Sequence, residues 1–455
     1  MSMVGFLREA VKRFCKDRGG NVMMMFGIAL VPLIGVAGAA VDYSRASNVR
    51  QALNAAIDSA ALMAARDAQK LTDAQLIDRI NAWVKDNLPA SARDEFTGAT
   101  VKIDRQARTV AIEATAQVPM AIVRVLGTDT LKVSSTSQST WGTNTIELAL
   151  VLDNTGSMAQ KDKMTALKAA ATDLINIMKD AATETDQIRI SIVPFNTQVR
   201  IARTFQNAQW LRFGLTRDVS CNSNKTKCTD ARTGSTISDL DGLSCSTKNG
   251  KTTCTQSLSK TSWVKTSEGC VTDRDQNYDV RDGGVYTDSQ QQYPAYWCTQ
   301  STLAEILPLT SDWSTLTSRV NSMTPVGATN VTIGAAWGWA TLTPGAPFSE
   351  AKPATEPRLK KYMILLTDGD NTQNRWDGNG SSSSSAVDAR TKLACANIKA
   401  DGINLYTIRV MDGNASMLRD CASRTDMYYE VKQASDLSPV FKAIASEISQ
   451  VRLTQ

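Results

Sequence analysis

The 455-residue chain contains no histidine. Catalysis by a Ser-His-Asp or Cys-His arrangement is therefore excluded, and so is a zinc site with histidine ligands. The chain also lacks a basic stripe. Outside the first 20 residues its charges nearly balance, so the sequence does not indicate a nucleic-acid-binding protein. The 42% hydrophobic and 21% charged content is ordinary for globular protein, and the length allows more than one domain.

The nine cysteines include no Cys-x-x-Cys pair, which favours disulfides over zinc. Cys15 stands alone near the N-terminus and is expected to be a free thiol. The other eight form an even set, which is typical of disulfides in an oxidising compartment. Other connectivities stay open from sequence alone, but pairing of neighbours predicts Cys221–Cys228, Cys245–Cys254, Cys270–Cys298 and Cys395–Cys421.

One run, Val22 to Val41, is free of charge over twenty residues and is long enough to cross a bilayer as a helix. Residues 1–20 before it carry five basic and two acidic side chains. The positive-inside rule places this basic segment in the cytoplasm and the rest of the chain outside it. The alternative is a secretory signal cleaved near Ala37-Gly38-Ala39. The length of the run, and the helical periodicity that continues beyond it, favour a retained anchor.

The continuation of that helix, to about residue 66, carries a narrow stripe of small and medium apolar residues at spacings of three and four. Two interpretations remain open: packing on the helix's own domain, or self-association of the chain through the helix. The stripe consists of Ala46, Val49, Leu53, Ala56, Ala60 and Met63.

Residues 67–144 predict a small α+β module without recognisable chemistry, which would separate the anchor from the rest of the chain. We expect a helix at Thr72–Asn87 and strands at Ala99–Asp104, Thr109–Gln117 and Leu131–Ser139. A polar turn near Arg105–Ala107 would join the first two strands.

From residue 145 to 455, strands and helices alternate, which predicts an α/β domain with a mostly parallel sheet and helices on both faces. Residues 205–305 interrupt the alternation. This stretch is rich in Ser, Thr, Asn and Gly and holds six cysteines, so we expect a disulfide-rich insertion. Its aromatic residues, Trp263, Tyr293 and Trp297, would form either the packing centre of the insertion or an exposed binding surface.

The first strand of this domain ends in a small polar loop. Asp153 closes the apolar run from Ile146, and Thr155 and Ser157 follow at alternate positions, before a helix at about 161–179. Open α/β sheets build ligand sites at the carboxyl ends of their strands. One carboxylate and two hydroxyls are oxygen donors that suit a hard cation such as Mg²⁺. The alternative is that these side chains only cap the helix.

This loop resembles the metal-ion-dependent adhesion site (MIDAS) of von Willebrand factor A (VWA) domains, whose first motif is Asp-x-Ser-x-Ser. Thr155 replaces the first Ser. The family pattern also has a Thr in a later loop and an Asp after another core strand, which Thr329 and Asp368 match. Capping would explain neither of these two.

The resemblance implies a Rossmann-like VWA domain that holds Mg²⁺, or Mn²⁺ or Ca²⁺. The cation would bind an acidic side chain of a protein partner. Asn330 and Asp370 lie beside the motifs and would support the ligands. The implied ligands are Asp153, Thr155, Ser157, Thr329 and Asp368.

A second resemblance covers residues 18–66. Gly19-Gly20-Asn21 before the apolar run, and Ala55 to Ala65 after it, are similar to the TadE/TadG proteins of Flp (tight adherence) pilus assembly. TadG-type members often carry a C-terminal VWA domain. Prepilin-type processing expects Glu at the fifth position after the cleaved Gly, and this chain has Met25 there, so cleavage of that kind is not expected.

The combined expectation is a non-enzymatic, single-span inner-membrane protein. Its C-terminal part would lie in the periplasm, or reach the cell surface, and bind partners in Flp pilus assembly or attachment. One alternative is an adhesin for an external ligand. Another is phosphoryl transfer, because Asp153-Asn154-Thr155-Gly156-Ser157 is similar to the phosphorylated motif of P-type ATPases. Asn154 replaces the Lys of that motif, and a phosphate-positioning Lys and nucleotide loop are not recognisable.

Overall fold

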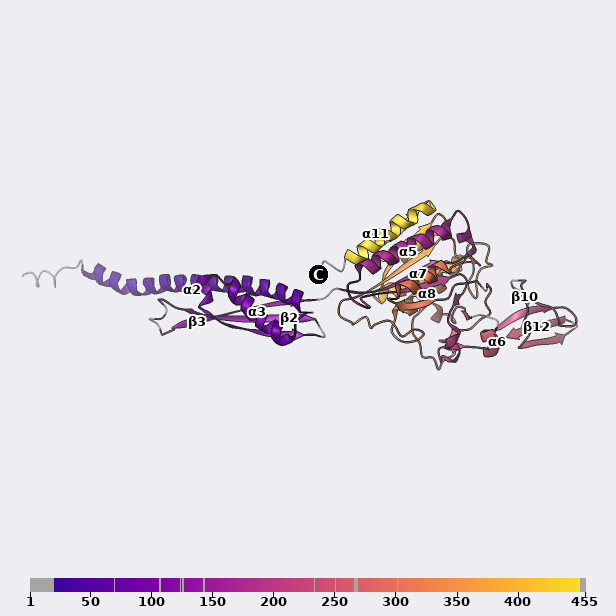
Figure 1. Cartoon of the computed structure of the whole chain (residues 1–455), viewed down its shortest axis with the longest axis horizontal. Coiled ribbons are helices and arrows are strands. Elements are labelled where there is room, and N and C mark those ends of the chain that lie inside the picture. The colour runs from indigo at the N-terminus through magenta and orange to yellow at the C-terminus, as the bar shows by residue number, and fades with distance from the viewer. Residues whose placement is uncertain are drawn as a thin grey trace, which may run out of the picture. The chain divides into compact units, whose positions relative to one another are not determined.

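The structure is a computed structural model that describes residues 20–68, 70–105, 108–122, 124, 127–141, 144–232, 234–249, 251–265, 269–300 and 302–450. The predicted cytoplasmic segment, apart from residue 20, lies outside these residues. So do Cys15 and most of the turn predicted at 105–107. The chain divides into two compact units, Met1–Gly142 and Thr143–Gln455 (Figure 1).

A single helix, α2 (Gly20–Asp67), contains the predicted apolar run and continues through Pro32. Most of the apolar side chains between Met25 and Val41 are exposed. By length and composition this helix can cross a membrane. A continuous apolar surface of this size is unfavourable in water, so the first half of α2 is suited to a lipid environment.

The second half of α2 belongs to the core of the first unit. Its stripe of apolar residues is buried, except for Met63, which is 40% exposed. The stripe packs with residues of a three-stranded sheet and of helix α3. Packing on its own domain is therefore the role of this stripe, and the stripe is not available for self-association.

The remaining elements of the first unit are close to those predicted. Helix α3 starts with a capping box, in which Thr72 and Gln75 each accept a hydrogen bond from the other's backbone N–H. The sheet is antiparallel with the order β1-β2-β3, and alternate residues of β2 face the core. The elements are α3 (Asp73–Asn87), α4 (Ala90–Arg93), β1 (Phe96–Asp104), β2 (Thr109–Pro119) and β3 (Thr130–Thr140).

Asp42, directly after the apolar run, fixes α2 to the loop that follows β2. Its buried carboxylate accepts hydrogen bonds from the backbone N–H groups of Ala121 and Ile122, both at 3.0 Å. One turn earlier, a Cβ atom on Gly38 would lie 2.2 Å from Cγ2 of Ile122. Only a residue without a side chain lets the helix and this loop approach so closely.

The second unit is built on a six-stranded sheet with the order β15-β5-β4-β16-β17-β18. Its strands are parallel except β15, which pairs antiparallel with β5 at one edge. The prediction of an α/β fold with a mostly parallel sheet is confirmed. The strands are β4 (Thr145–Asp153), β5 (Ile188–Phe195), β15 (Leu307–Thr310), β16 (Leu359–Thr367), β17 (Asn404–Val410) and β18 (Tyr428–Val431).

Helices cover both faces of this sheet. Leu148, Leu150 and Leu152 of β4 face a core formed with α5, α7 and α11, whereas Ala149 and Val151 face a core formed with α8, α9 and α10. A strand that buries both faces is apolar on both of them, as β4 is from Leu148 to Leu152. The helices are α5 (Lys163–Ala181), α7 (Trp313–Asn321), α8 (Val331–Leu342), α9 (Ser385–Ala400), α10 (Ala415–Cys421) and α11 (Leu437–Gln450).

The insertion has an inner and an outer part. Trp263, Tyr293 and Trp297 of the inner part are buried in the core beside α8, so they are a packing centre and not an exposed surface. The outer part is an antiparallel five-stranded sheet with the order β10-β9-β8-β12-β11, which projects from the body of the unit (Figure 1). Its strands are β8 (Thr216–Cys221), β9 (Cys228–Asp230), β10 (Thr236–Ile237), β11 (Leu243–Lys248) and β12 (Lys251–Ser257).

Short elements connect these parts. They are η2 (Gly156–Ala159), β6 (Val199–Arg200), η3 (Arg203–Asn207), β7 (Leu211–Arg212), α6 (Lys260–Lys265), β13 (Cys270–Val271), η4 (Tyr278–Val280), β14 (Tyr293–Pro294), η5 (Thr425–Met427) and η6 (Ala434–Asp436).

The structure contains the four disulfides that pairing of neighbours predicts. Two of them join residues directly opposite each other in the outer sheet, Cys221 with Cys228 and Cys245 with Cys254. The buried apolar cluster of this sheet is small, so cross-links contribute much of what holds it together.

Candidate functional site

Three loops meet at the carboxyl edge of the six-stranded sheet. The first follows β4 and carries Asp153, Thr155 and Ser157, the second precedes α8 and carries Thr329, and the third follows β16 and carries Asp368. Because β4 and β16 are adjacent and parallel, the loops that follow them leave the sheet side by side.

Asp153 lies at the base of this site and is fully buried. One carboxylate oxygen accepts a hydrogen bond from the backbone N–H of Thr155 at 2.8 Å, and the other accepts from the Thr367 hydroxyl at 2.6 Å. Burial, and then the nearby charge of Asp368, raise the pKa of Asp153 to about 7. A cation close to this pair of carboxylates would offset their repulsion and favour the ionised form.

The hydroxyls of the first loop lie against the second carboxylate. The Thr155 and Ser157 side-chain oxygens are 2.9 Å apart, and the Ser157 hydroxyl donates to Oδ1 of Asp368 at 2.5 Å. The loop is also tied to the one before α8, because the backbone N–H of Gly156 donates to the carbonyl of Gly327 at 2.9 Å. Direct hydrogen bonds therefore connect Asp153, Thr155, Ser157 and Asp368 into one cluster.

Thr329 faces the same cluster. A Cβ atom on Gly369 would lie 3.5 Å from the Ser157 hydroxyl oxygen and 3.6 Å from the Thr329 hydroxyl oxygen. Both hydroxyl oxygens therefore lie within van der Waals contact of one position above Gly369. The backbone of Thr329 is held by the loop after β16, since its carbonyl accepts from the N–H groups of Thr372 and Gln373 at 2.9 and 3.2 Å.

The two neighbouring polar candidates have different surroundings. Asn330 is buried, caps α8 by accepting from the backbone N–H of Ile333, and donates to both carboxylate oxygens of Asp273 at 3.0 Å. Asp370 is exposed. Asn330 thus orients the start of α8 and supports Thr329 through the backbone.

The alternative that Thr155 and Ser157 only cap a helix receives no support. Thr155 stands at the N-cap of the short helix η2 without a side-chain capping bond, and α5 starts after Asp162, which makes no such bond either. The hydroxyls are directed to each other and to Asp368 instead.

Lys163 is a site residue that the sequence analysis did not identify. Its ammonium lies 2.7 Å from Oδ2 of Asp368, and the two side chains are 3% and 0% exposed. The same ammonium is 3.5 Å from the mostly exposed carboxylate of Asp412. Lys163 begins α5 among the buried residues Met164 and Leu167, and no pattern in the sequence distinguishes it from a solvated lysine.

These residues fit a divalent cation. The cluster offers carboxylate and hydroxyl oxygens, which are the ligands that Mg²⁺, Mn²⁺ and Ca²⁺ prefer. With both aspartates ionised, two carboxylates face one ammonium, so a negative charge remains for a cation to balance. The atoms that would hold it are the hydroxyls of Thr155, Ser157 and Thr329 and the Asp368 carboxylate, whose oxygens also contact Ser157 and Lys163, with Asp153 behind them.

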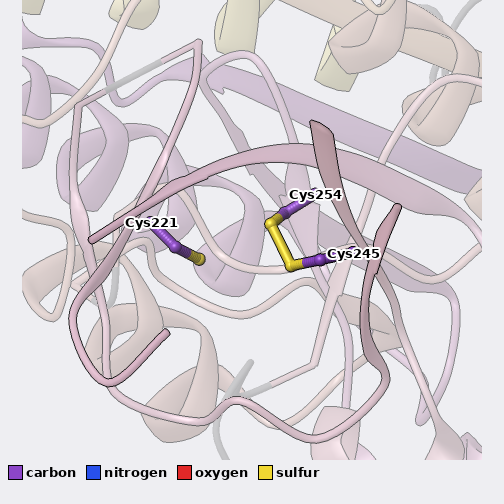
Figure 2. Close-up of side chains that lie close together, drawn as sticks. All are labelled: Cys221, Cys245 and Cys254. Carbon is purple, nitrogen blue, oxygen red and sulfur yellow. A yellow bond between two sulfur atoms is a disulfide. The ribbon is translucent and has the colours of Figure 1, made fainter. Parts of the chain in front are cut away.

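A second group of metal-ligand side chains lies in the outer sheet of the insertion. The sulfur atoms of Cys221, Cys245 and Cys254 are all within 4.8 Å of one another (Figure 2). Cys245 and Cys254 are bonded to each other, and Cys221 is bonded to Cys228. Since thiolates bind metals and disulfide sulfurs do not supply them, this group is a pair of adjacent cross-links and not a zinc site.

Comparison with known proteins finds a family match for the N-terminal helix. Residues 20–67, which are helix α2, match the family model of TadE/G-like Flp pilus-assembly proteins. A search of curated proteins finds no match. The family match and the apolar helix together indicate a membrane-anchored protein with a link to Flp pili.

Several solved structures have a distant likeness to the chain. They include pilus adhesin SpaC from Lactobacillus rhamnosus GG, at 11% identity and a TM-score of 0.36, covering 78% of this chain and 34% of SpaC. The vWF domain of the type V pili tip protein Mfa5 from Porphyromonas gingivalis has 9% identity and a TM-score of 0.36, covering 69% of this chain and 98% of that domain.

Proximal thread matrix protein 1 from the mussel byssus, with a zinc-occupied MIDAS motif, has 15% identity and a TM-score of 0.31, covering 68% of this chain and 46% of that one. The chain spans only about a third of SpaC and less than half of the byssus protein. At these scores the likenesses assign neither fold nor function.

Proposed function

We propose that this protein is a membrane-anchored, non-enzymatic component of Flp pilus assembly or attachment that binds partner proteins through a divalent cation. The observation that carries the proposal is the convergence of Asp153, Thr155, Ser157, Thr329 and Asp368, which come from three loops, on one position at the carboxyl edge of the sheet. In this proposal the second unit is a VWA domain and the converging residues are its MIDAS.

The anchor would be helix α2, held in the inner membrane with residues 1–20 in the cytoplasm. The second unit would then lie in the periplasm. Four disulfides in this unit are consistent with an oxidising compartment. Because α2 runs without a break from the apolar run into the core of the first unit, the helix serves better as a retained anchor than as a cleaved signal.

The bound cation would act as a Lewis acid for a partner's carboxylate. Each protein residue has a separate part in this. The three hydroxyls and Asp368 would orient the cation, and Asp153 would supply charge from behind. Lys163 neutralises one of the two aspartates, so a site with a divalent cation carries a net positive charge and attracts an acidic side chain.

The experiment is a titration of the full chain, purified in detergent, with Mn²⁺ and Mg²⁺ in a calorimeter. Thr329→Val removes one hydroxyl while keeping the shape of the side chain, and we expect it to weaken cation binding by about tenfold or more, about 1.4 kcal/mol. Thr236→Val, on an exposed strand of the outer sheet, is the matched control and should bind as the wild type does.

The partner would be sought by cross-linking in envelope membranes with and without a chelator. Capture of Flp-pilus secretion components that depends on the cation supports assembly, and capture of host or matrix proteins supports attachment. Wild-type protein that binds neither Mn²⁺ nor Mg²⁺, or a Thr329→Val variant with unchanged affinity, would refute the cation site.

A further inference from the structure

A polar cavity of about 260 Å³ lies beside the candidate cation site, and three parts of the second unit form it. Thr197 and Gln198 come from the loop directly after β5, at the same edge of the sheet as Asp153. Gln373 and Arg375 come from the loop after β16. Arg232 comes from the outer sheet of the insertion. The cavity therefore lies between the insertion and the edge of the sheet that carries the cation site.

The cavity is next to the cation site along the chain and in space. The backbone N–H of Gln373 donates to the carbonyl of Thr329 at 3.2 Å. A Cβ atom on Gly380 would lie 3.0 Å from the side-chain amide of Gln373 and 3.5 Å from Cβ of Ala328. Gln373 thus has the cavity on one side and the loop of Thr329 on the other, so one bound polypeptide segment can reach both.

The charged residues of the cavity are paired, except for one. Arg375 is paired with Asp275 at 2.5 Å, and Asp230 lies 3.5 Å from Arg217. Arg232 is exposed, and within the part of the chain that the structure describes it forms no ion pair. Its guanidinium therefore remains available to pair with a carboxylate of a bound ligand.

Arg232 is nevertheless held in place. Its Nη2 donates to the carbonyl of Asn374 at 3.0 Å. With the Gln373 amide oriented to satisfy its neighbours, the side-chain oxygen of Gln373 accepts from the same guanidinium. Both partners are neutral, so they position the guanidinium without cancelling its charge. A fixed guanidinium loses little conformational entropy when it binds a carboxylate.

The residue after the cavity-lining Arg375 is of a type typical of protein-binding surfaces. Trp376 is 39% exposed and is stacked by the guanidinium of Arg375 at 5.3 Å from the ring centroid. Exposed tryptophan and arginine are enriched where proteins bind one another.

We propose that this cavity is the second half of the partner-binding surface and takes a second acidic side chain of the segment whose first acidic side chain binds the cation. The proposal rests on the proposed function. Its ligand is an extended acidic segment of a partner protein: one carboxylate lies at the cation, the chain passes Trp376 and Gln373, and the other carboxylate pairs with Arg232.

The test uses the full chain in detergent with Mn²⁺ at saturation and two kinds of synthetic probe. The first is a Gly-Ser peptide with one Asp, and the second is a set of Gly-Ser peptides with two Asp residues at graded separations. We expect the best two-Asp peptide to bind about five- to tenfold more tightly than the one-Asp peptide, because it adds one charge-assisted hydrogen-bonded pair. The gain should shrink as NaCl is raised.

Arg232→Gln should remove this gain while leaving the binding of Mn²⁺ alone unchanged, since Arg232 does not belong to the cation site. Arg203→Gln is the matched control, because Arg203 is also exposed and donates to a backbone carbonyl, that of Val264. The control should keep the gain.

The outcomes separate the two proposals. A wild-type protein that does not bind Mn²⁺ refutes the cation site itself. Three outcomes with normal Mn²⁺ binding refute the cavity proposal and leave the cation site unaffected. The peptides do not bind at all, a second Asp does not raise peptide affinity, or the higher affinity persists in Arg232→Gln.

Discussion

Replacement of Lys163 by Met tests the electrostatics of the candidate cation site most directly. The change removes the ammonium 2.7 Å from Oδ2 of Asp368 and keeps a long, flexible side chain in the buried position. Breaking a buried ion pair by removing one partner costs about 3–5 kcal/mol, because the other charge is left without compensation. For a domain of this size, the melting temperature should fall by roughly 10 °C in the absence of a divalent cation.

The same replacement should strengthen cation binding. With Asp153 and Asp368 ionised, the three side chains carry a net charge of −1, and removal of the Lys163 ammonium changes this to −2. A divalent cation and an ammonium roughly 5 Å apart repel each other by about 7 kcal/mol at an effective dielectric constant of about 20. Even if water and rearrangement screen most of this, we expect the affinity for Mn²⁺ or Mg²⁺ to rise by about tenfold or more, about 1.4 kcal/mol.

Calorimetric titration with Mn²⁺ and thermal unfolding with and without Mn²⁺ measure both effects. Saturating Mn²⁺ should raise the melting temperature of the Lys163→Met protein more than that of the wild type. Lys168→Met is the control, because Lys168 is on the same helix and donates to the carbonyl of Asn321 at the surface. A Lys163→Met protein that loses stability and binds Mn²⁺ no better than the wild type would refute the reasoning. Lys163 would then serve only to hold Asp368.

Two further predictions concern other buried carboxylates. Asp42→Ala leaves the N–H groups of Ala121 and Ile122 without acceptors, so the free energy of unfolding of the first unit should fall by about 1–3 kcal/mol. These two amides should also exchange with deuterium faster. Unchanged exchange, or an equal effect of Asp58→Ala at an exposed position, would contradict this. Burial raises the pKa of Asp273 from 3.8 to about 6. The stability contributed by its protonated form is therefore complete below about pH 4 and is lost as the pH rises through about 6. The free energy of unfolding should change by about 3 kcal/mol over this range. Asp273→Asn should flatten this part of the stability-pH curve in chelator-containing buffer, and a curve parallel to that of the wild type would show that Asp273 is not its source.

The elements with a clear hydrophobic pattern could be predicted from the sequence. The strands β4, β5 and β16 each contain an apolar run because both faces are covered, and the helix signal of Thr72–Asn87 begins at a recognisable cap. The strand β15 could not be predicted. It has four residues, one of them Pro308, and proline is tolerated because the strand lies at the edge of the sheet.

The outer sheet was expected only as part of a disulfide-rich insertion, and its strands were not predicted. Its strand β11 has mostly exposed residues, so no hydrophobic alternation marks it. The cross-links and the hydrogen bonds between strands hold this sheet, and neither leaves a periodic pattern in the sequence.

The candidate site was predicted in part for a similar reason. Asp153, Thr155 and Ser157 are close in the sequence and follow a clear strand, so their proximity follows from local structure. Lys163 and Arg232 are surface-type residues whose roles depend on tertiary contacts, with Asp368 in one case and with Gln373 and Asn374 in the other. No local pattern distinguishes such residues from solvated ones.

The outer sheet leaves the body of the second unit and returns to it at almost the same point. The backbone N–H of Gly214 donates to the carbonyl of Leu258 at 3.0 Å, and the N–H of Leu258 donates to the carbonyl of Leu215 at 2.9 Å. Everything between these residues could be exchanged, lengthened or trimmed as a cassette while the two ends stay joined. Arg232 belongs to that cassette, so under the proposed binding of an acidic segment an exchanged cassette would change the second contact without disturbing the sheet beneath.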